Sequence, residues 1–92
     1  MTAKEQVQVM NPLGLHLRSS MELAQVASRI ESRLEVTYSG RRVDLRSILG
    51  ILSLGAHQGD VLEFKAEGAD AREALDAILG LFLRRLNHLL NP

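Results

Sequence analysis

Residues 33–45, RLEVTYSGRRVDL, decide the fold, because their pattern predicts a β-hairpin. Apolar and polar residues alternate on both sides of a turn signal at Ser39-Gly40, and this period of two is typical of a strand with one buried face. The alternating apolar residues are Leu34, Val36 and Tyr38 before the turn, and Val43 and Leu45 after it. The hairpin predicts an antiparallel sheet that is covered on one face and exposed to water on the other.

The segments on either side of the hairpin predict two more strands and three helices. Alternation at about residues 4–10 and 62–66 predicts the strands. Apolar spacings of three and four predict a helix that ends near Ile30 and contains Leu17, Met21, Leu23, Ala24, Val26 and Ala27. We expect a short helix at 47–54, ended by Gly55, and a last helix at 70–90 with Asp70 as its N-cap. The apolar stripe of the last helix consists of Ala74, Leu75, Ile78, Leu79, Phe82, Leu86 and Leu89.

The order of these elements is β-α-β-β-α-β-α. A chain of 92 residues favours one domain, which we expect to cover residues 1–92. Because the sheet has one apolar face, the helices should lie together on that face. The sequence therefore predicts an α+β fold, an open-faced β-sandwich in which three helices cover one face of a four-stranded antiparallel sheet.

Composition argues against several classes of function. Lys and Arg together number 11, as do Asp and Glu, and aromatic residues make up 3% of the chain, so we expect no nucleic-acid partner. The longest apolar stretch, residues 78–83, is far below the roughly 18 residues of a membrane span. Cys is absent and the three histidines are scattered, so we expect no metal site. Without cysteine or a signal-peptide pattern at residues 1–9, we expect the chain in the cytoplasm.

Residues 14–18, Gly-Leu-His-Leu-Arg, are the strongest candidate for chemistry, since they stand where a loop enters the first helix. Unpaired N–H groups and the positive end of the helix dipole make such a place a natural phosphate site. His16 adds a nucleophilic imidazole, and Arg18 adds a cation suited to phosphoryl oxygens. From the spacing alone, the alternative is that His16 is only a helix-end residue and Arg18 a solvated charge.

Three blocks of the sequence resemble the HPr family, the histidine-containing phosphocarriers of the sugar phosphotransferase system. Residues 11–18 resemble the family's active-site signature, 40–50 its regulatory-serine region, and 54–60 the turn that follows. The resemblance covers nearly all of residues 4–86. It implies that His16 accepts a phosphoryl group on Nδ1 from enzyme I, at the expense of phosphoenolpyruvate, and passes it to enzyme IIA-type proteins. It also implies that Arg18 and the backbone N–H groups of Leu17 and Arg18 hold that group, with no cofactor. Such a carrier is not a free-standing turnover enzyme.

The active-site block departs from the family pattern G-L-H-A-R-P-A at three positions. Leu17 and Ser20 replace alanines, and Ser19 replaces a proline. Ser19-x-x-Glu22 is itself a capping box, which would start the helix at Ser19, whereas the resemblance starts it just after His16. We expect the latter. The changes also leave an alternative function open, namely an HPr-like regulatory interaction module with little or no phosphotransfer.

The resemblance assigns further roles outside the active-site block. Ser47 matches the serine that an HPr kinase phosphorylates in part of the family; the alternative is that it only caps the short helix. Residues matching partner-docking positions are Leu17, Ile48, Leu49 and Leu52. Ile48, Leu49 and Leu52 cannot all face inward on one short helix. We assign no function to His57 or His88. We expect a monomer, with self-association as the alternative, through the apolar tail of Phe82, Leu83, Leu86, Leu89 and Leu90.

Overall fold

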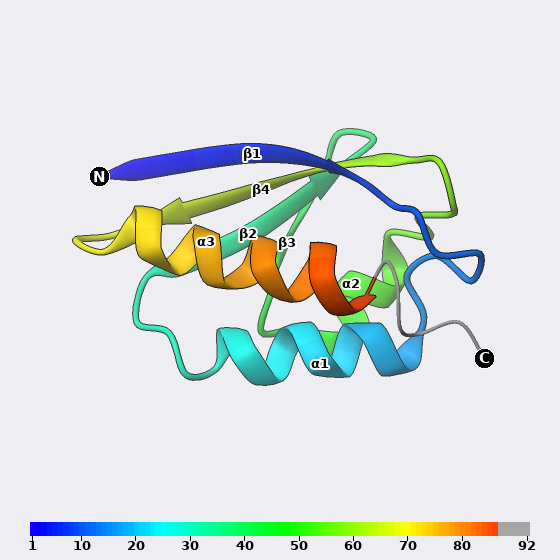
Figure 1. Ribbon diagram of the computed structural model, residues 1–92, viewed down its shortest axis with the longest axis horizontal. Coiled ribbons are helices and arrows are strands. Elements are labelled where there is room, and N and C mark those ends of the chain that lie inside the picture. Colours follow the sequence, from blue (N-terminus) through cyan, green and yellow to red (C-terminus); the bar gives the residue numbers. More distant parts are fainter. Residues whose placement is uncertain (87–92) are drawn as a thin grey trace.

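The computed structural model describes residues 1–86 and contains one antiparallel sheet (Figure 1). Its strands are β1 (Thr2–Gln8), β2 (Arg33–Tyr38), β3 (Arg41–Asp44) and β4 (Val61–Glu67), in the order β1-β4-β2-β3. The predicted hairpin is formed by β2 and β3, with Val36 opposite Val43. Residues of one face are buried in alternation, as at Leu62, Phe64 and Ala66 of β4. The period of two therefore predicted both the strands and the face that each residue occupies.

Three helices cover that one face of the sheet (Figure 1). They are α1 (Leu17–Ala27), α2 (Ile48–Ser53) and α3 (Ala71–Leu81), so the predicted α+β open-faced sandwich is confirmed. Figure 1 shows that α1 and α3 begin at opposite ends of the molecule. Within residues 1–86, none of the helices combines the length and apolarity needed to cross a bilayer.

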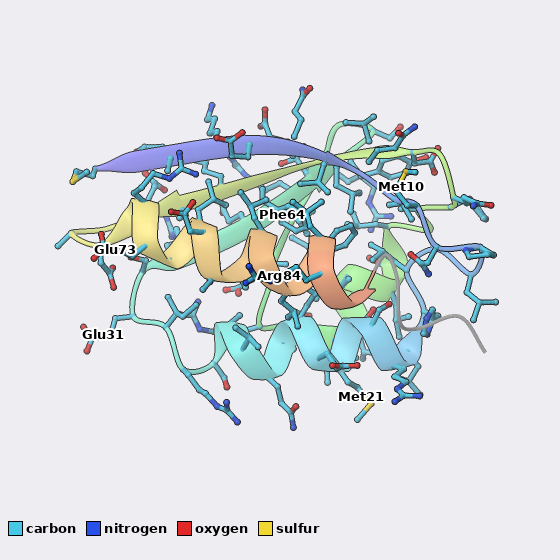
Figure 2. The ribbon with its side chains drawn as sticks, in the orientation of Figure 1. Met10, Met21, Glu31, Phe64, Glu73 and Arg84 are labelled. Carbon is cyan, nitrogen blue, oxygen red and sulfur yellow. The ribbon has the colours of Figure 1, made fainter. Side chains whose placement is uncertain are left out.

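The core lies between the sheet and the helices, and two aromatic rings meet in it. Phe64 of β4 points from the sheet towards α3 (Figure 2) and contacts Phe82 edge to face, with ring centroids 5.4 Å apart. Both side chains are fully buried. This geometry suits the quadrupoles of two aromatic rings, and it fixes the end of α3 against the centre of the sheet.

The last helix is where the predicted elements differ most from the structure. A continuous α-helix to Leu90 was expected, but the regular helix ends at Leu81 and continues as a π-helical turn, η1 (Phe82–Leu86). Asp70 is the N-cap as predicted, although its carboxylate accepts a hydrogen bond from the Ser32 hydroxyl and none from the first turn of α3. His88, Leu89 and Leu90 lie outside the described residues, so self-association through the tail stays a prediction.

The turn that precedes β4 is held by the carboxylate of Asp60. The N–H of His57 donates to Asp60 Oδ2 at 2.7 Å, and so does the Tyr38 hydroxyl, also at 2.7 Å. The bond from His57 N–H is the largest cause that lowers the pKa of Asp60 below its ordinary value of 3.8, and the bond from Tyr38 adds to it. The same carboxylate raises the pKa of Tyr38.

We expect this carboxylate to make the fold sensitive to acid. Because the pKa of Asp60 is lower in the folded chain than in the unfolded chain, its stabilisation is complete above the unfolded value. The stabilisation is lost as the pH falls through the folded value. Asp60→Asn keeps an acceptor oxygen but cannot ionise, so urea unfolding of this variant should lose less stability than wild type between about pH 5 and pH 3. Equal losses in the two proteins would contradict this assignment.

Candidate functional site

The loop between β1 and α1 is closed on itself by Asn11. The Asn11 side-chain amide donates to the Gly14 carbonyl at 2.9 Å, and the Asn11 carbonyl accepts from the Gly14 N–H at 3.1 Å. Asn11 is almost fully buried. These two bonds make residues 11–14 a compact turn that ends two residues before His16.

The same loop rests on the segment that follows α2. The Leu15 N–H donates to the Ala56 carbonyl at 3.1 Å, and the Leu15 side chain is buried. Gly14 has a φ of +66°, and a Cβ at this position would lie 2.4 Å from the Ala56 oxygen. Only glycine combines this backbone conformation with so close an approach, so Gly14 fixes where residues 15 and 16 stand.

His16 is the N-cap of α1, with an extended backbone (φ −131°, ψ −179°). Its carbonyl accepts the first helical hydrogen bond, from the Ser20 N–H at 2.9 Å. The helix therefore starts where the resemblance placed it, and the start at Ser19 suggested by the local capping signal is wrong. The N–H groups of Leu17 and Arg18 precede the first intrahelical bond and belong to the positive end of the helix.

The imidazole of His16 is half-buried. Its Nε2 atom is enclosed and has no hydrogen-bond partner among residues 1–86. The ring is therefore neither in the core nor fully in solvent.

Ser19, which stands in place of the family's proline, completes the cap from inside the helix. Its hydroxyl accepts a hydrogen bond from the His16 N–H at 3.0 Å and donates to the His16 carbonyl at 3.1 Å. Ser19 is buried, and so is the next residue, Ser20. The Ser20 hydroxyl, by contrast, has no hydrogen-bond partner in the described part of the chain.

These two serines make a matched pair for mutation. Ser19→Ala removes both hydroxyl bonds to His16 and is expected to cost about 1 kcal/mol of unfolding free energy. Ser20→Ala removes a buried hydroxyl that gains nothing from its position, so we expect no loss and a gain of up to about 1 kcal/mol. Urea unfolding measures both, and the reverse order of stabilities would contradict the hydrogen-bond assignment.

Arg18 is close to His16 on α1 but is mostly solvated. Its side chain is 70% exposed, and its Nε lies 3.9 Å from Glu22 Oε2 one turn along the helix. Both residues line a shallow groove of about 670 Å³ together with His16. The other residues of this His16 groove are Leu13, Leu17, Met21 and Gln25. The structure brings His16, Leu17 and Arg18, which were predicted from the sequence, into one groove; the sequence analysis did not assign Glu22 to this site, although its i,i+4 spacing from Arg18 on a helix is a signal that could have done so.

Met21 is one of the apolar residues whose spacing predicted α1, but it does not lie on the buried face of that helix. The buried face of α1 runs through Ser20, Leu23 and Ala27, and Met21 is turned from Ser20 by about 100°. Its side chain is 46% exposed and projects away from the sheet (Figure 2). Met21 also lines a second groove, between α1 and α2, which it shares with Ala24, Gln25, Ser28, Arg46 and Ile48. Met21 therefore joins the His16 groove to α2.

The predicted partner-docking residues differ in exposure. Leu17 is 58% exposed beside His16, and Leu49 on α2 is 79% exposed. Ile48 and Leu52 are half-buried, and the residue of α2 that enters the core is Ile51. The structure thus brings Leu17 and Ile48 to adjoining grooves and leaves Leu49 as the most exposed apolar side chain of α2.

Ser47 is the N-cap of α2, with its hydroxyl accepting from the Gly50 N–H at 2.9 Å. The residue is exposed. The capping role that we weighed from the sequence is therefore present. Within residues 1–86, no group of three or more His, Asp or Glu side chains is arranged to hold a metal ion.

Comparison with known proteins agrees with this geometry. Residues 3–83 match a family model described as the PTS HPr component phosphorylation site. The chain is 39% identical over 77 residues to the phosphocarrier protein HPr of Cupriavidus necator, covering 84% of this chain and 86% of that one. It is 40% identical over 78 residues to HPr of Neisseria meningitidis, covering 85% and 88%. The crystal structure of HPr-C-His from Thermoanaerobacter tengcongensis superposes with a TM-score of 0.87 at 34% identity, over 96% of this chain and 99% of that one.

His16 is the N-cap of α1, and Gly14 fixes the loop that precedes it. The family model matches most of the chain. The chain belongs to the HPr family, the phosphocarriers of the phosphotransferase system.

Proposed function

We propose that His16 accepts a phosphoryl group from phosphorylated enzyme I and passes it to an enzyme IIA-type protein. The observation that carries the proposal is the imidazole at the N-cap of α1, half-buried and lining an open groove. Nε2 is enclosed, so we expect Nδ1 to be the nucleophile. In the transfer, the Nδ1–phosphorus bond forms as the bond from phosphorus to the donor breaks. No cofactor is needed, because the group is carried covalently.

Two features of this chain would hold the phosphoryl group. The N–H groups of Leu17 and Arg18 lie at the positive end of α1, which contributes about 0.3–1 kcal/mol for an anion at an exposed site. Arg18 supplies a full charge. Its pair with Glu22 is long and largely solvated, and such surface pairs are worth little. We therefore propose that Arg18 exchanges Glu22 for the phosphoryl oxygens at little cost.

The partner surface that we propose surrounds His16. Leu17 lies in the His16 groove, and Ile48, Leu49 and Leu52 belong to α2, which packs beside α1. Exposed apolar side chains near a reactive group are typical of a transient protein–protein interface. We propose that the chain acts as a monomer in the cytoplasm, in keeping with a sequence that contains no cysteine.

The test is phosphorylation of the purified chain by enzyme I and phosphoenolpyruvate. We expect a mass increase of one phosphoryl group, which is lost in acid and retained in base, as for a phosphohistidine. Subsequent addition of an enzyme IIA protein should remove it. Binding to enzyme I without any mass increase would overturn the proposal and favour the regulatory interaction module.

We also propose that Ser47 is a second, regulatory phosphorylation site. Its hydroxyl is exposed and caps α2, so a phosphate there would replace the bond to Gly50 and add negative charge beside Ile48. Incubation with an HPr kinase should label the wild type and leave Ser47→Ala unlabelled. Equal labelling of the two proteins would exclude Ser47 as the site.

A further inference from the structure

A turn far from His16 in sequence supports the loop that carries His16. This turn, residues 57–60, is held at Asp60, whose Oδ2 accepts from the His57 N–H and from the Tyr38 hydroxyl, each at 2.7 Å. A backbone bond from Asp60 N–H to the His57 carbonyl, at 3.0 Å, closes the turn. Tyr38 is the last residue of β2, so the Asp60 carboxylate ties the turn to the centre of the sheet.

Four hydrogen bonds connect this turn and Ala56 to residues 9–15, which precede His16. The N–H of Gly59 donates to the Val9 carbonyl and the N–H of Val9 to the Asp60 carbonyl, both at 2.8 Å. The Gln58 side-chain amide donates to the Met10 carbonyl at 2.9 Å. Finally, the Ala56 carbonyl accepts from the Leu15 N–H at 3.1 Å. Both ends of the loop from residue 9 to residue 15 therefore rest on the segment from 56 to 60.

We infer that Asp60 is a positioning residue for His16, acting through the turn that its carboxylate holds and the Leu15–Ala56 bond. Asp60 does not line the His16 groove, so it has no part in holding the phosphoryl group. The side chain of His57 points into solvent, 84% exposed, with its Nδ1 3.9 Å from Asp60. It therefore adds little to the turn beyond its backbone N–H.

The geometry also says which property of Asp60 matters. Both short bonds end on one oxygen, Oδ2. An asparagine offers a single oxygen that can accept from both donors, whereas an alanine offers none. Asp60→Asn therefore removes the charge but keeps the acceptor atom, and we expect this variant to position His16 as the wild type does.

The experiment compares Asp60→Ala and Asp60→Asn with a matched control, Asp70→Ala. Asp70 also accepts a side-chain hydrogen bond, from Ser32, but it stands at the start of α3, at the end of the molecule opposite the start of α1 (Figure 1). The first readout is hydrogen exchange of the Leu15 amide by NMR. The second is phosphoryl transfer from enzyme I, resolved into kcat and KM for this chain.

In Asp60→Ala we expect exchange of the Leu15 amide to accelerate by about tenfold, and kcat to fall by about tenfold with KM unchanged, because a displaced nucleophile reacts less often in the bound complex. Asp60→Asn should stay within about twofold of wild type in both readouts, and Asp70→Ala should lose stability without either effect. If Asp60→Ala does not fold, Tyr38→Phe, which removes one of the two bonds, should show the same effects in smaller degree.

The inference would be overturned if the Leu15 amide of Asp60→Ala exchanged at the wild-type rate. It would also be overturned if Asp60→Asn changed Leu15 exchange and phosphoryl transfer as much as Asp60→Ala does. The kinetic readout rests on the proposed function, whereas the exchange readout does not. If the wild type accepts no phosphoryl group but the variants differ in Leu15 exchange as expected, the proposed function fails. Asp60 would then still be the residue that positions the loop.

Discussion

His16→Ala is expected to abolish phosphoryl uptake completely, whereas His57→Ala should be labelled like the wild type. The two imidazoles differ in their surroundings and not in their chemistry. His16 caps α1 and lines the groove that also holds Arg18. His57 stands in a turn and is 84% exposed. Of these two histidines, only His16 lies at a helix N-terminus, where unpaired backbone N–H groups can donate to phosphoryl oxygens as we propose.

Loss of label in His16→Ala is informative only if the variant folds. The His16 side chain makes no capping hydrogen bond, and both hydrogen bonds between His16 and the Ser19 hydroxyl involve the His16 backbone. We therefore expect urea unfolding of His16→Ala to stay within about 1 kcal/mol of wild type. Label that persists in His16→Ala, or that disappears in His57→Ala, would place the acceptor elsewhere.

Gly14→Ala is expected to be the most damaging single-methyl change near the site, and Gly55→Ala is its matched control. Both glycines have a φ of +66°, so an alanine at either position carries the same strain of about 1–2 kcal/mol. A Cβ on Gly55 meets nothing within 4 Å, whereas a Cβ on Gly14 would lie 2.4 Å from the Ala56 oxygen and 2.9 Å from the His57 Cα. Backbone atoms must move to accept it, which adds about 1–3 kcal/mol.

The difference between the two variants isolates the contact from the backbone strain. We expect urea unfolding to show a loss of about 2–5 kcal/mol for Gly14→Ala and about 1–2 kcal/mol for Gly55→Ala. The added methyl group would also push Leu15 away from Ala56 and so displace His16. We therefore expect Gly14→Ala to slow phosphoryl transfer by about tenfold or more, under conditions in which the variant is folded. Equal stabilities of the two variants would show that the loop does not rest on residues 56 and 57 as described.

The sequence predicted the fold well because its signals are local and periodic. Alternation along residues 33–45 depends only on which side chains face the helices, and this holds however the strands are ordered. The order β1-β4-β2-β3 was not predictable in the same way, since it depends on contacts between distant segments. The length of the last helix was overestimated because the apolar stripe continues unbroken past Leu81, although the backbone changes there to a π-helical turn.

At the site, the local capping signal alone would have placed the start of α1 at the wrong residue. The capping box at Ser19 is a real local pattern, but the bond from Leu15 to Ala56 fixes the loop so that His16 becomes the N-cap. Ser19 then serves as the third residue of the helix and returns a hydrogen bond to His16. The sequence placed Asp60 in a turn but did not predict its hydrogen bonds, because its partners on β2 and in the loop before α1 are brought close only by the folded sheet.

The exposure of Met21, Leu17 and Leu49 has a consequence for the binding specificity of a carrier of this kind. Leu17 and Met21 line the groove of His16 and Leu49 lies on α2, and none of the three side chains belongs to the core. On the partner surface that we propose, we therefore expect substitutions of these side chains to change which proteins bind, without loss of the fold and without touching His16 or Arg18. A few substitutions of solvent-exposed side chains would then be enough to change binding specificity, since no core residue has to be repacked.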